Sequence, residues 1–261
     1  MLVTGASQGI GWELARCFAR DRHDVVLVAR SEHELEARAA ELRAVFGVQA
    51  LPFVLDLSQP EGPARLFAAL EGRGLHVEVL VNNAGFGLYG AFSESDVHED
   101  LELMRLNVLS LAVLTRLFLP DMIERSSGGI LNVGSMAGFQ PGPLMALYYA
   151  SKAFVLSFSE ALANELQGTG VRVGVLCPGP TLTGFQSRAG IQGALFRRGV
   201  MSAAEVARIG YLGFRRGRIT VIPGLRNRLL AFAVRFAPRR LVPEVVRRLQ
   251  EKRLSPLPAA K

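Results

Sequence analysis

The chain has 261 residues, 49% of them hydrophobic, which is enough for one large domain with a filled core and argues against disorder. Its formal net charge is +7, with −6 over residues 1–196 (14 basic, 20 acidic) and +13 over residues 197–261 (16 basic, three acidic). The two cysteines, Cys17 and Cys177, lie far apart in apolar sequence, so we expect reduced buried thiols in a cytosolic protein, with no disulfide and no metal site.

The first predicted unit is a strand, a glycine-rich turn and a helix. An apolar run over residues 1–4 leads into the sequence TGASQGIG at 4–11, and residues 12–20 have helical periodicity. Glycines let the backbone approach a ligand, and a helix N-terminus offers unpaired N–H groups to a pyrophosphate. The spacing Gly-xxx-Gly-x-Gly therefore indicates a dinucleotide site, with a plain glycine turn as the alternative. The strand is short, because a central strand typically has about 5–6 residues.

The second unit indicates which dinucleotide binds. Residues 24–29 (DVVLVA) form an apolar strand typical of a parallel sheet, and the strand ends at Arg30. Ser31 and Glu34 form a capping box that starts a helix running to about Phe46. An acidic residue at this strand end binds the 2′-hydroxyl of NAD, whereas an arginine accommodates the 2′-phosphate of NADP. Arg30 favours NADP(H) over NAD(H), the alternative being a solvated arginine at a helix start.

Strands and helices continue to alternate along the chain. We expect further strands at 49–55, 77–81, 130–133, 171–176 and 219–222. We expect helices at 60–71 and at 93–125, the second with a break or bend near Pro120. A further helix contains Tyr148 and runs to about residue 167, and another follows an N-cap at Ser202. This alternation predicts an α/β fold with a Rossmann-like doubly wound parallel sheet, in one domain over residues 1–223. Basic amphipathic helices at 225–237 and 242–253 would form a C-terminal extension over residues 224–261.

The pair Tyr148 and Lys152 is the candidate for acid–base chemistry. Residues four apart on a helix share a face, and a nearby positive charge lowers a tyrosine pKa that is ordinarily about 10. Tyr149 has no such partner, because Ala153 stands four residues on. Lys152 is one of only three lysines among 30 basic residues, which favours a specific role over a solvated surface lysine. Ser135 follows a predicted strand at the end where ligands bind in open α/β sheets.

With these motifs in place, the chain resembles the short-chain dehydrogenase/reductase family over about residues 2–185. The resemblance rests on TGASQGIG, Asp56-Leu57, NNAG at 82–85, Ser135 with Tyr148-xxx-Lys152, and PGPTLT at 178–183. It implies cofactor contacts at Gly5, Ser7, Gln8, Gly9, Ile10, Gly11, Arg30, Asp56, Leu57, Asn83, Ala84, Gly85, Tyr148, Lys152, Pro178, Gly179, Thr181 and Thr183. Gln8 departs from the pattern, since many relatives that use NADP have a basic residue there, and this weakens the assignment to NADP(H).

The resemblance also implies a role for each catalytic residue. Tyr148 would exchange a proton with the reacting oxygen, which Ser135 would bind. Lys152 would hold the nicotinamide ribose and lower the pKa of Tyr148, and Asn107 would kink its helix and hold a water in a proton relay. The cofactor supplies the hydride. Family members are commonly dimers or tetramers joined through the helices that contain Asn107 and Tyr148, so we expect a homodimer or homotetramer.

The C-terminal third bears on the substrate and on location. Residues 184–200 are expected to form a lid whose apolar side chains suggest a hydrophobic carbonyl or alcohol, such as a 3-oxoacyl, steroid-like or other lipid ketone. The alternative is that the lid is apolar only because it closes on a protein surface. The basic helices would rest on an anionic membrane or pack against the protein itself. With few aromatic residues in the tail, we expect no nucleic-acid binding.

The sequence contains no secretion leader and no charge-free apolar run of about 18 residues, so we expect a cytoplasmic protein that is neither exported nor membrane-spanning, with peripheral membrane contact left open. The predicted function is an NADP(H)-dependent oxidoreductase. A nucleotide-sensing scaffold that has lost the chemistry is the alternative.

Overall fold

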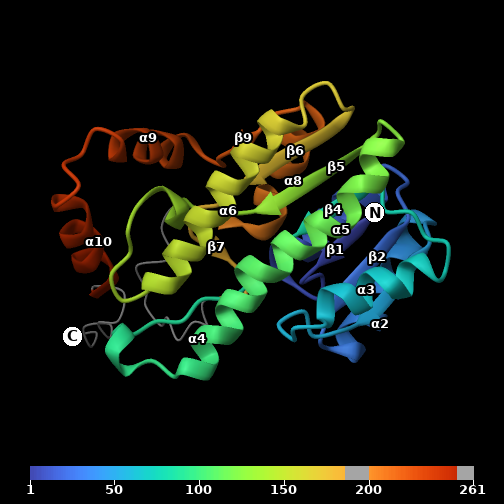
Figure 1. Ribbon diagram of the computed structural model, residues 1–261, viewed down its shortest axis with the longest axis horizontal. Coiled ribbons are helices and arrows are strands. Elements are labelled where there is room, and N and C mark those ends of the chain that lie inside the picture. The colour runs from blue at the N-terminus through green and yellow to red at the C-terminus, as the bar shows by residue number, and fades with distance from the viewer. Residues whose placement is uncertain (186–199, 252–261) are drawn as a thin grey trace, which may run out of the picture.

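A seven-stranded parallel sheet forms the centre of the protein. The computed structural model describes residues 1–185 and 200–251 (Figure 1). The strand order is β3-β2-β1-β4-β5-β6-β9, and each neighbouring pair is parallel. The strands are β1 (Leu2–Thr4), β2 (Val25–Ala29), β3 (Ala50–Val54), β4 (Val79–Asn82), β5 (Gly128–Val133), β6 (Val171–Leu176) and β9 (Thr220–Val221). The predicted doubly wound parallel sheet is confirmed.

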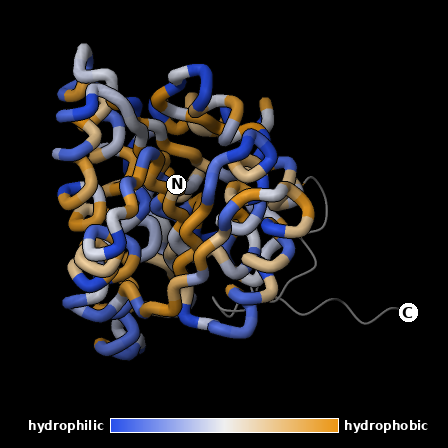
Figure 2. Tube along the Cα trace, turned by 90° about the vertical axis from the view of Figure 1, so that its right-hand side faces the viewer, coloured by the Kyte–Doolittle hydropathy of each residue, from blue (hydrophilic) through white to orange (hydrophobic). Residues whose placement is uncertain are grey.

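Helices cover both faces of this sheet. One layer contains α1 (Gly9–Arg20), α2 (Glu32–Phe46) and α8 (Ala203–Arg215), and the other contains α3 (Gly62–Glu71), α5 (Leu111–Glu124) and α6 (Ala146–Glu165). Figure 2 shows the hydrophobic strands between these two layers. Successive strand residues point to opposite faces, so Val3 joins the first core and Leu2 joins the second. Burial on both faces explains why the strands are continuous apolar runs.

The short first strand is held on both sides. β1 has three buried residues and pairs with β2 and with β4. Backbone bonds continue the ladder beyond its ends, since Val26 donates to the Met1 carbonyl (2.8 Å) and Ala6 donates to the Val28 carbonyl (3.2 Å). Three residues therefore suffice for a central strand here.

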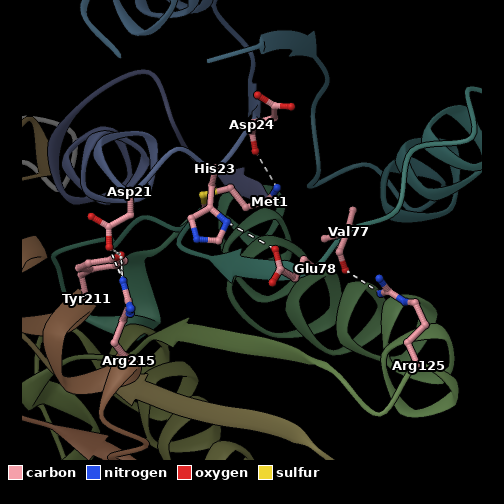
Figure 3. A network of polar contacts seen from close by, with 9 residues as sticks. All are labelled: Met1, Asp21, His23, Asp24, Val77, Glu78, Arg125, Tyr211 and Arg215. Atoms are coloured by element: carbon pink, nitrogen blue, oxygen red, sulfur yellow. Dashed lines mark hydrogen bonds and ion pairs between the residues drawn. The ribbon is translucent and has the colours of Figure 1, made fainter. Parts of the chain in front are cut away.

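Polar contacts lie at the end of the sheet where the strands begin (Figure 3). Tyr211 and Arg215 of α8 both donate to the carboxylate of Asp21 at the end of α1. Nearby, His23 Nδ1 lies 3.5 Å from Glu78 Oε2. The contacts of Asp21 join α8 to α1 on the side of the molecule opposite the carboxyl ends of the strands.

The long helical segment differs from the prediction in where it is irregular. Pro120 lies inside α5, which continues unbroken to Glu124, whereas a π-helical stretch, η2 (Arg105–Ser110), separates α4 (Val97–Met104) from α5. Of the predicted break or bend near Pro120, the break is therefore wrong. Buried residues of α5 such as Leu114 and Phe118 pack on the sheet, and this packing outweighs the one hydrogen bond that proline removes.

The segment Val97–Glu124 is also the one described helix long and apolar enough to cross a membrane by length and composition. Its most apolar window has a mean hydropathy of 1.5 and is 44% buried within the protein. A core helix that packs on a sheet has the same composition.

The start of the C-terminal extension packs against the body of the protein. α9 (Leu225–Val234) and α10 (Leu241–Glu251) lie beside α6 at one end of the molecule (Figure 1). Val242 and Val246 of α10 form a hydrophobic cluster with Ala137, Met145 and Tyr149. Most of the predicted lid (186–199) and the last ten residues (252–261) lie outside the described residues.

Several local predictions are confirmed, and some short elements were not foreseen. The Ser31 and Ser202 hydroxyls accept from the backbone N–H of Glu34 (3.5 Å) and Glu205 (3.2 Å), as N-caps should. The unpredicted elements are the 3₁₀ turns η1 (Phe92–Glu94) and η3 (Met136–Phe139) and the strand pair β7 (Thr181–Leu182) and β8 (Met201–Ser202).

Candidate active site

A cavity of about 1310 Å³ lies at the carboxyl ends of the strands. Its wall combines the glycine turn, the ends of the central strands, α6, α9 and α10. Among the predicted site residues, those that line it are Gly5, Ser7, Gln8, Gly9, Ile10, Arg30, Asp56, Leu57, Asn83, Ala84, Gly85, Ser135, Tyr148, Lys152, Pro178, Gly179, Thr181 and Thr183. Gly11 and Asn107 stand behind this wall.

The glycine turn is packed too tightly at Gly11 for a side chain there. A Cβ at Gly11 would lie 2.3 Å from Asn83 Nδ2 and 2.4 Å from the Gly5 carbonyl oxygen. The same Asn83 amide donates to the carbonyls of Thr4 (2.9 Å) and Gly5 (3.0 Å). The Thr4 hydroxyl in turn accepts from the N–H groups of Asn83 and Ala84, each at 3.0 Å. Gly11 therefore lets the turn, the helix and the NNAG segment meet.

The start of α1 fits a phosphate group. The N-cap residue Gln8 makes no side-chain hydrogen bond to the first turn, and Gln8, Gly9 and Ile10 line the cavity. The first N–H groups of a helix have no partner within it, and they carry the positive end of the helix dipole. The residues present thus match the pyrophosphate of a dinucleotide.

Arg30 lies at the rim of the cavity beside two carboxylates. Its Nη1 is 3.3 Å from Glu102 Oε1 and 4.0 Å from Asp56 Oδ2, and its side chain is half exposed. Burial tends to raise the pKa of Asp56, but hydrogen bonds from Ser58 and the charge of Arg30 lower it overall. Asp56 is therefore an ionised acceptor at neutral pH.

A second arginine, which the sequence analysis did not single out, lies against the turn. Arg38 Nε donates to the Ser7 carbonyl (3.1 Å), and its guanidinium carbon lies 4.7 Å from the centre of the Trp12 ring. Ser7 lines the cavity whereas Arg38 does not, and Arg38 Nη1 also lies 3.3 Å from Glu41 Oε2, so the positive charge of Arg38 near the turn is partly offset by this carboxylate. Only folding brings Arg38 to this position, because it is 31 residues from Ser7.

Tyr148, Lys152 and Ser135 meet in the cavity, as the motif predicts. Lys152 Nζ lies 6.0 Å from the centre of the Tyr148 ring and donates to the Val133 carbonyl (2.8 Å). Burial raises the pKa of Tyr148 to about 12, and a hydrogen bond with Ser135 opposes this rise. Burial also lowers the pKa of Lys152 to about 8, which the neighbouring Cys177 opposes. In this structure the expected lowering of the Tyr148 pKa is therefore absent, because burial is the largest effect and raises the pKa.

Asn107 connects two parts of the site from behind. It is 1% exposed, and its amide accepts from Phe86 N–H (3.1 Å) while donating to the Phe86 carbonyl (2.9 Å) and to Ser151 Oγ (3.1 Å). Ser151 in turn donates to the Tyr148 carbonyl (2.7 Å). The helix irregularity expected around Asn107 is present as η2. Its role in a water relay stays a prediction.

The far half of the cavity is mainly apolar, and residues of the C-terminal helices line it. Met145, Phe185 and Val246 line it together with Tyr149. The buried Gln250 of α10 donates from Nε2 to the Tyr149 hydroxyl (2.8 Å). Because the two residues are 101 positions apart, the sequence carried no signal for this bond.

Comparison with known proteins places the chain in a family. The sequence model described as short chain dehydrogenase matches residues 1–192. The chain belongs to the short-chain dehydrogenase family. This short-chain dehydrogenase is 40% identical over 182 residues to the very-long-chain 3-oxoacyl-CoA reductase of Anas platyrhynchos, covering 68% of this chain and 58% of that protein. It is 38% identical over 181 residues to the ketoacyl reductase HetN of a Nostoc species, covering 69% of this chain and 62% of that protein.

A solved structure agrees over the whole chain. A short-chain dehydrogenase from Sphingobium yanoikuyae in complex with NADPH is 34% identical and superposes with a TM-score of 0.81, covering 100% of this chain and 98% of that one. The match to the two curated relatives spans only about three fifths of their length. The family and fold of this short-chain dehydrogenase are thus shown.

Proposed function

We propose that this short-chain dehydrogenase interconverts a carbonyl group and a secondary alcohol on a hydrophobic substrate, with NADP(H) as its nucleotide. The observation that carries this proposal is the meeting of Ser135, Tyr148 and Lys152 in one cavity with the glycine turn. A protein that only binds a nucleotide has no need for a buried phenol beside a hydroxyl and an ammonium group. The second candidate is a nucleotide-sensing scaffold that has lost the chemistry. The experiment below distinguishes it from the enzyme.

In the reducing direction, the residues of this site handle a proton and a developing negative charge. The bound nicotinamide nucleotide supplies the hydride to the carbonyl carbon. The Tyr148 hydroxyl donates its proton to the carbonyl oxygen and becomes a phenolate, while the Ser135 hydroxyl donates a hydrogen bond to the same oxygen. A pKa of about 12 keeps Tyr148 protonated at neutral pH, ready to act as the acid. The Lys152 ammonium stabilises the phenolate that remains.

The apolar half of the cavity supports a lipid-like ketone as the substrate. The curated relatives are named as ketoacyl and very-long-chain 3-oxoacyl-CoA reductases, which favours a 3-oxoacyl compound over a steroid-like one. We propose a 3-oxoacyl chain whose apolar end lies against residues of α6, α9 and α10 such as Met145, Val234 and Val246.

NADP(H) is supported by two arginines at the turn and the rim. Arg30 can bind a 2′-phosphate if it releases Glu102, and Arg38 adds positive charge beside Ser7. The solved relative from Sphingobium yanoikuyae contains NADPH. The substitution Arg30→Ala is expected to weaken NADPH binding about tenfold or more, with little change in the affinity for NADH. Equal losses for both nucleotides would contradict the assignment of Arg30 to the 2′-phosphate.

The decisive experiment measures NADPH oxidation against 3-oxoacyl, steroid and aromatic ketones, with Tyr148→Phe and the distant Tyr211→Phe as matched variants. We expect turnover that falls at least about a hundredfold in Tyr148→Phe and persists in Tyr211→Phe, while both bind NADPH. Tight NADPH binding without turnover on any ketone or on the corresponding alcohols would favour the sensing scaffold.

We further propose a homodimer or homotetramer joined through α4, α5 and α6. Leu101, Val113 and Phe154 on these helices, and Leu109 in η2 between α4 and α5, are between 37% and 57% exposed, as expected for a face that a second copy covers. Light scattering of the purified protein would test this assembly. The location that we propose is the cytoplasm, at the surface of a membrane that holds the substrate.

A further inference from the structure

Helix α9 has two apolar faces, and among residues 1–185 and 200–251 only one of them lines the cavity. At about 100° per residue, Leu230 and Val234 share one face of α9, and Ala237 lies in the turn after the helix. These three residues line the cavity. Leu225, Leu229, Phe232 and Phe236 share a different face, and none of them lines the cavity. We call these four residues the outer stripe.

The outer stripe is unusually exposed for large apolar side chains. Leu225, Leu229, Phe232 and Phe236 are 70%, 61%, 61% and 72% exposed. The rings of Phe232 and Phe236 contact each other edge to face, with centres 5.0 Å apart. Adjacent exposed apolar side chains that form one patch mark an interaction site far more often than scattered ones do.

Positive charge surrounds this stripe. Residues 206–243 contain nine arginines and no acidic residue. Arg228 and Arg235 flank the stripe on α9, and Arg239 and Arg240 follow it, all with exposed side chains. Within residues 1–185 and 200–251 none of these four arginines forms a salt bridge. The patch is therefore apolar at its centre and cationic at its edge.

We propose that the outer stripe docks on an anionic lipid membrane, with its leucines and phenylalanines among the acyl chains and the arginines at the lipid phosphates. An apolar stripe with a basic border on a surface helix matches the interface of such a membrane. A second copy of the chain fits less well, because pairing two stripes would bring arginines of like charge together.

The docked orientation would place the mouth of the cavity near the bilayer. Leu230, Leu241, Val245 and Leu249 line the cavity and yet are between 51% and 54% exposed, so the cavity opens between α9 and α10. Leu230 is next to Leu229 of the outer stripe. A lipid-like ketone would then enter from the membrane without crossing water, an extension that rests on the function proposed above.

Co-sedimentation with lipid vesicles tests the docking. The full chain is mixed at low salt with vesicles of phosphatidylcholine alone or of equal parts phosphatidylcholine and phosphatidylglycerol. We expect binding to the anionic vesicles only, reduced by molar salt and reduced about tenfold or more by Phe232→Ser with Phe236→Ser. Phe92→Ser is the matched control, because Phe92 is 64% exposed and does not line the cavity, and it should bind as the unaltered chain does.

Three outcomes would overturn the proposal. In the first, the unaltered chain does not bind anionic vesicles. In the second, the double variant binds them as well as the unaltered chain does. In the third, the double variant converts an oligomer to a monomer, which would make the outer stripe a contact between copies. Turnover of a short water-soluble ketone separates this test from the proposed function. A chain that reduces such a ketone but ignores vesicles refutes the docking alone, and a chain that binds vesicles without reducing any ketone refutes the proposed function alone.

Discussion

A methyl group added at Gly11 would test how the glycine turn is built. In Gly11→Ala the new Cβ would lie 2.3 Å from Asn83 Nδ2 and 2.4 Å from the Gly5 carbonyl oxygen. The Asn83 side chain can move, but the Gly5 oxygen belongs to the backbone of the turn. Moving Asn83 would break its two hydrogen bonds, to the carbonyls of Thr4 and Gly5. The substitution therefore changes the surface that should receive the pyrophosphate.

Three contributions set the size of the effect on stability. Alanine in place of glycine within a helix stabilises by about 1 kcal/mol. Against this stand two hydrogen bonds of about 1 kcal/mol each and an overpacking cost of about 1–3 kcal/mol. The net expectation is a loss of about 2–4 kcal/mol in the free energy of unfolding, which for a chain of this size lowers Tm by about 4–16 °C.

Urea unfolding and a fluorescence titration with NADPH measure the two consequences. We expect a lower urea midpoint with an unchanged slope, and NADPH binding weakened about tenfold or more. Gly72→Ala is the matched control, because Gly72 has an ordinary φ of −62° and its Cβ would come no nearer than 3.2 Å to another atom. A Gly11→Ala protein with the stability and NADPH affinity of the unaltered chain would refute the close packing of the turn.

Three further predictions concern buried groups around the site. Because the pKa of Lys152 is lowered to about 8, this residue binds fewer protons in the folded protein than in the unfolded chain from pH 8 to about 10, so its own contribution to the free energy of unfolding should rise over this range. The buried thiols of Cys17 and Cys177, whose pKa values are raised, contribute a fall, so the test is the difference between the unaltered chain and Lys152→Met in urea titrations, and a difference that does not change with pH would contradict the shift. Asn107→Ala should lower the free energy of unfolding by about 2–3 kcal/mol, since it leaves buried backbone groups unpaired, and a loss below 1 kcal/mol would count against this. Gln250→Leu removes the donor to Tyr149 and should raise KM for long apolar ketones while leaving NADPH affinity unchanged, whereas an equal KM would show that α10 needs no such bond.

The features that the sequence determined by itself are those that depend on residues close together along the chain. The buried strands, the caps at Ser31 and Ser202 and the pairing of Tyr148 with Lys152 depend on residues no more than a few positions apart. Backbone geometry relates such residues in the same way in any fold. The order of strands and helices also followed from this local periodicity, and with it the parallel sheet that brings Ser135 and the glycine turn to one edge.

Other features were decided only by tertiary packing. Arg38 contacts Ser7 across 31 residues and Gln250 contacts Tyr149 across 101, and no local pattern specifies either pair. The direction of the Tyr148 pKa shift is a further case. The sequence spacing predicts the nearby charge of Lys152, but it does not predict the burial that removes water from around the phenol. The continuity of α5 through Pro120 has the same origin. Burial and long-range contacts are properties of the assembled core, so the physical terms that depend on them appear only once the chain has folded.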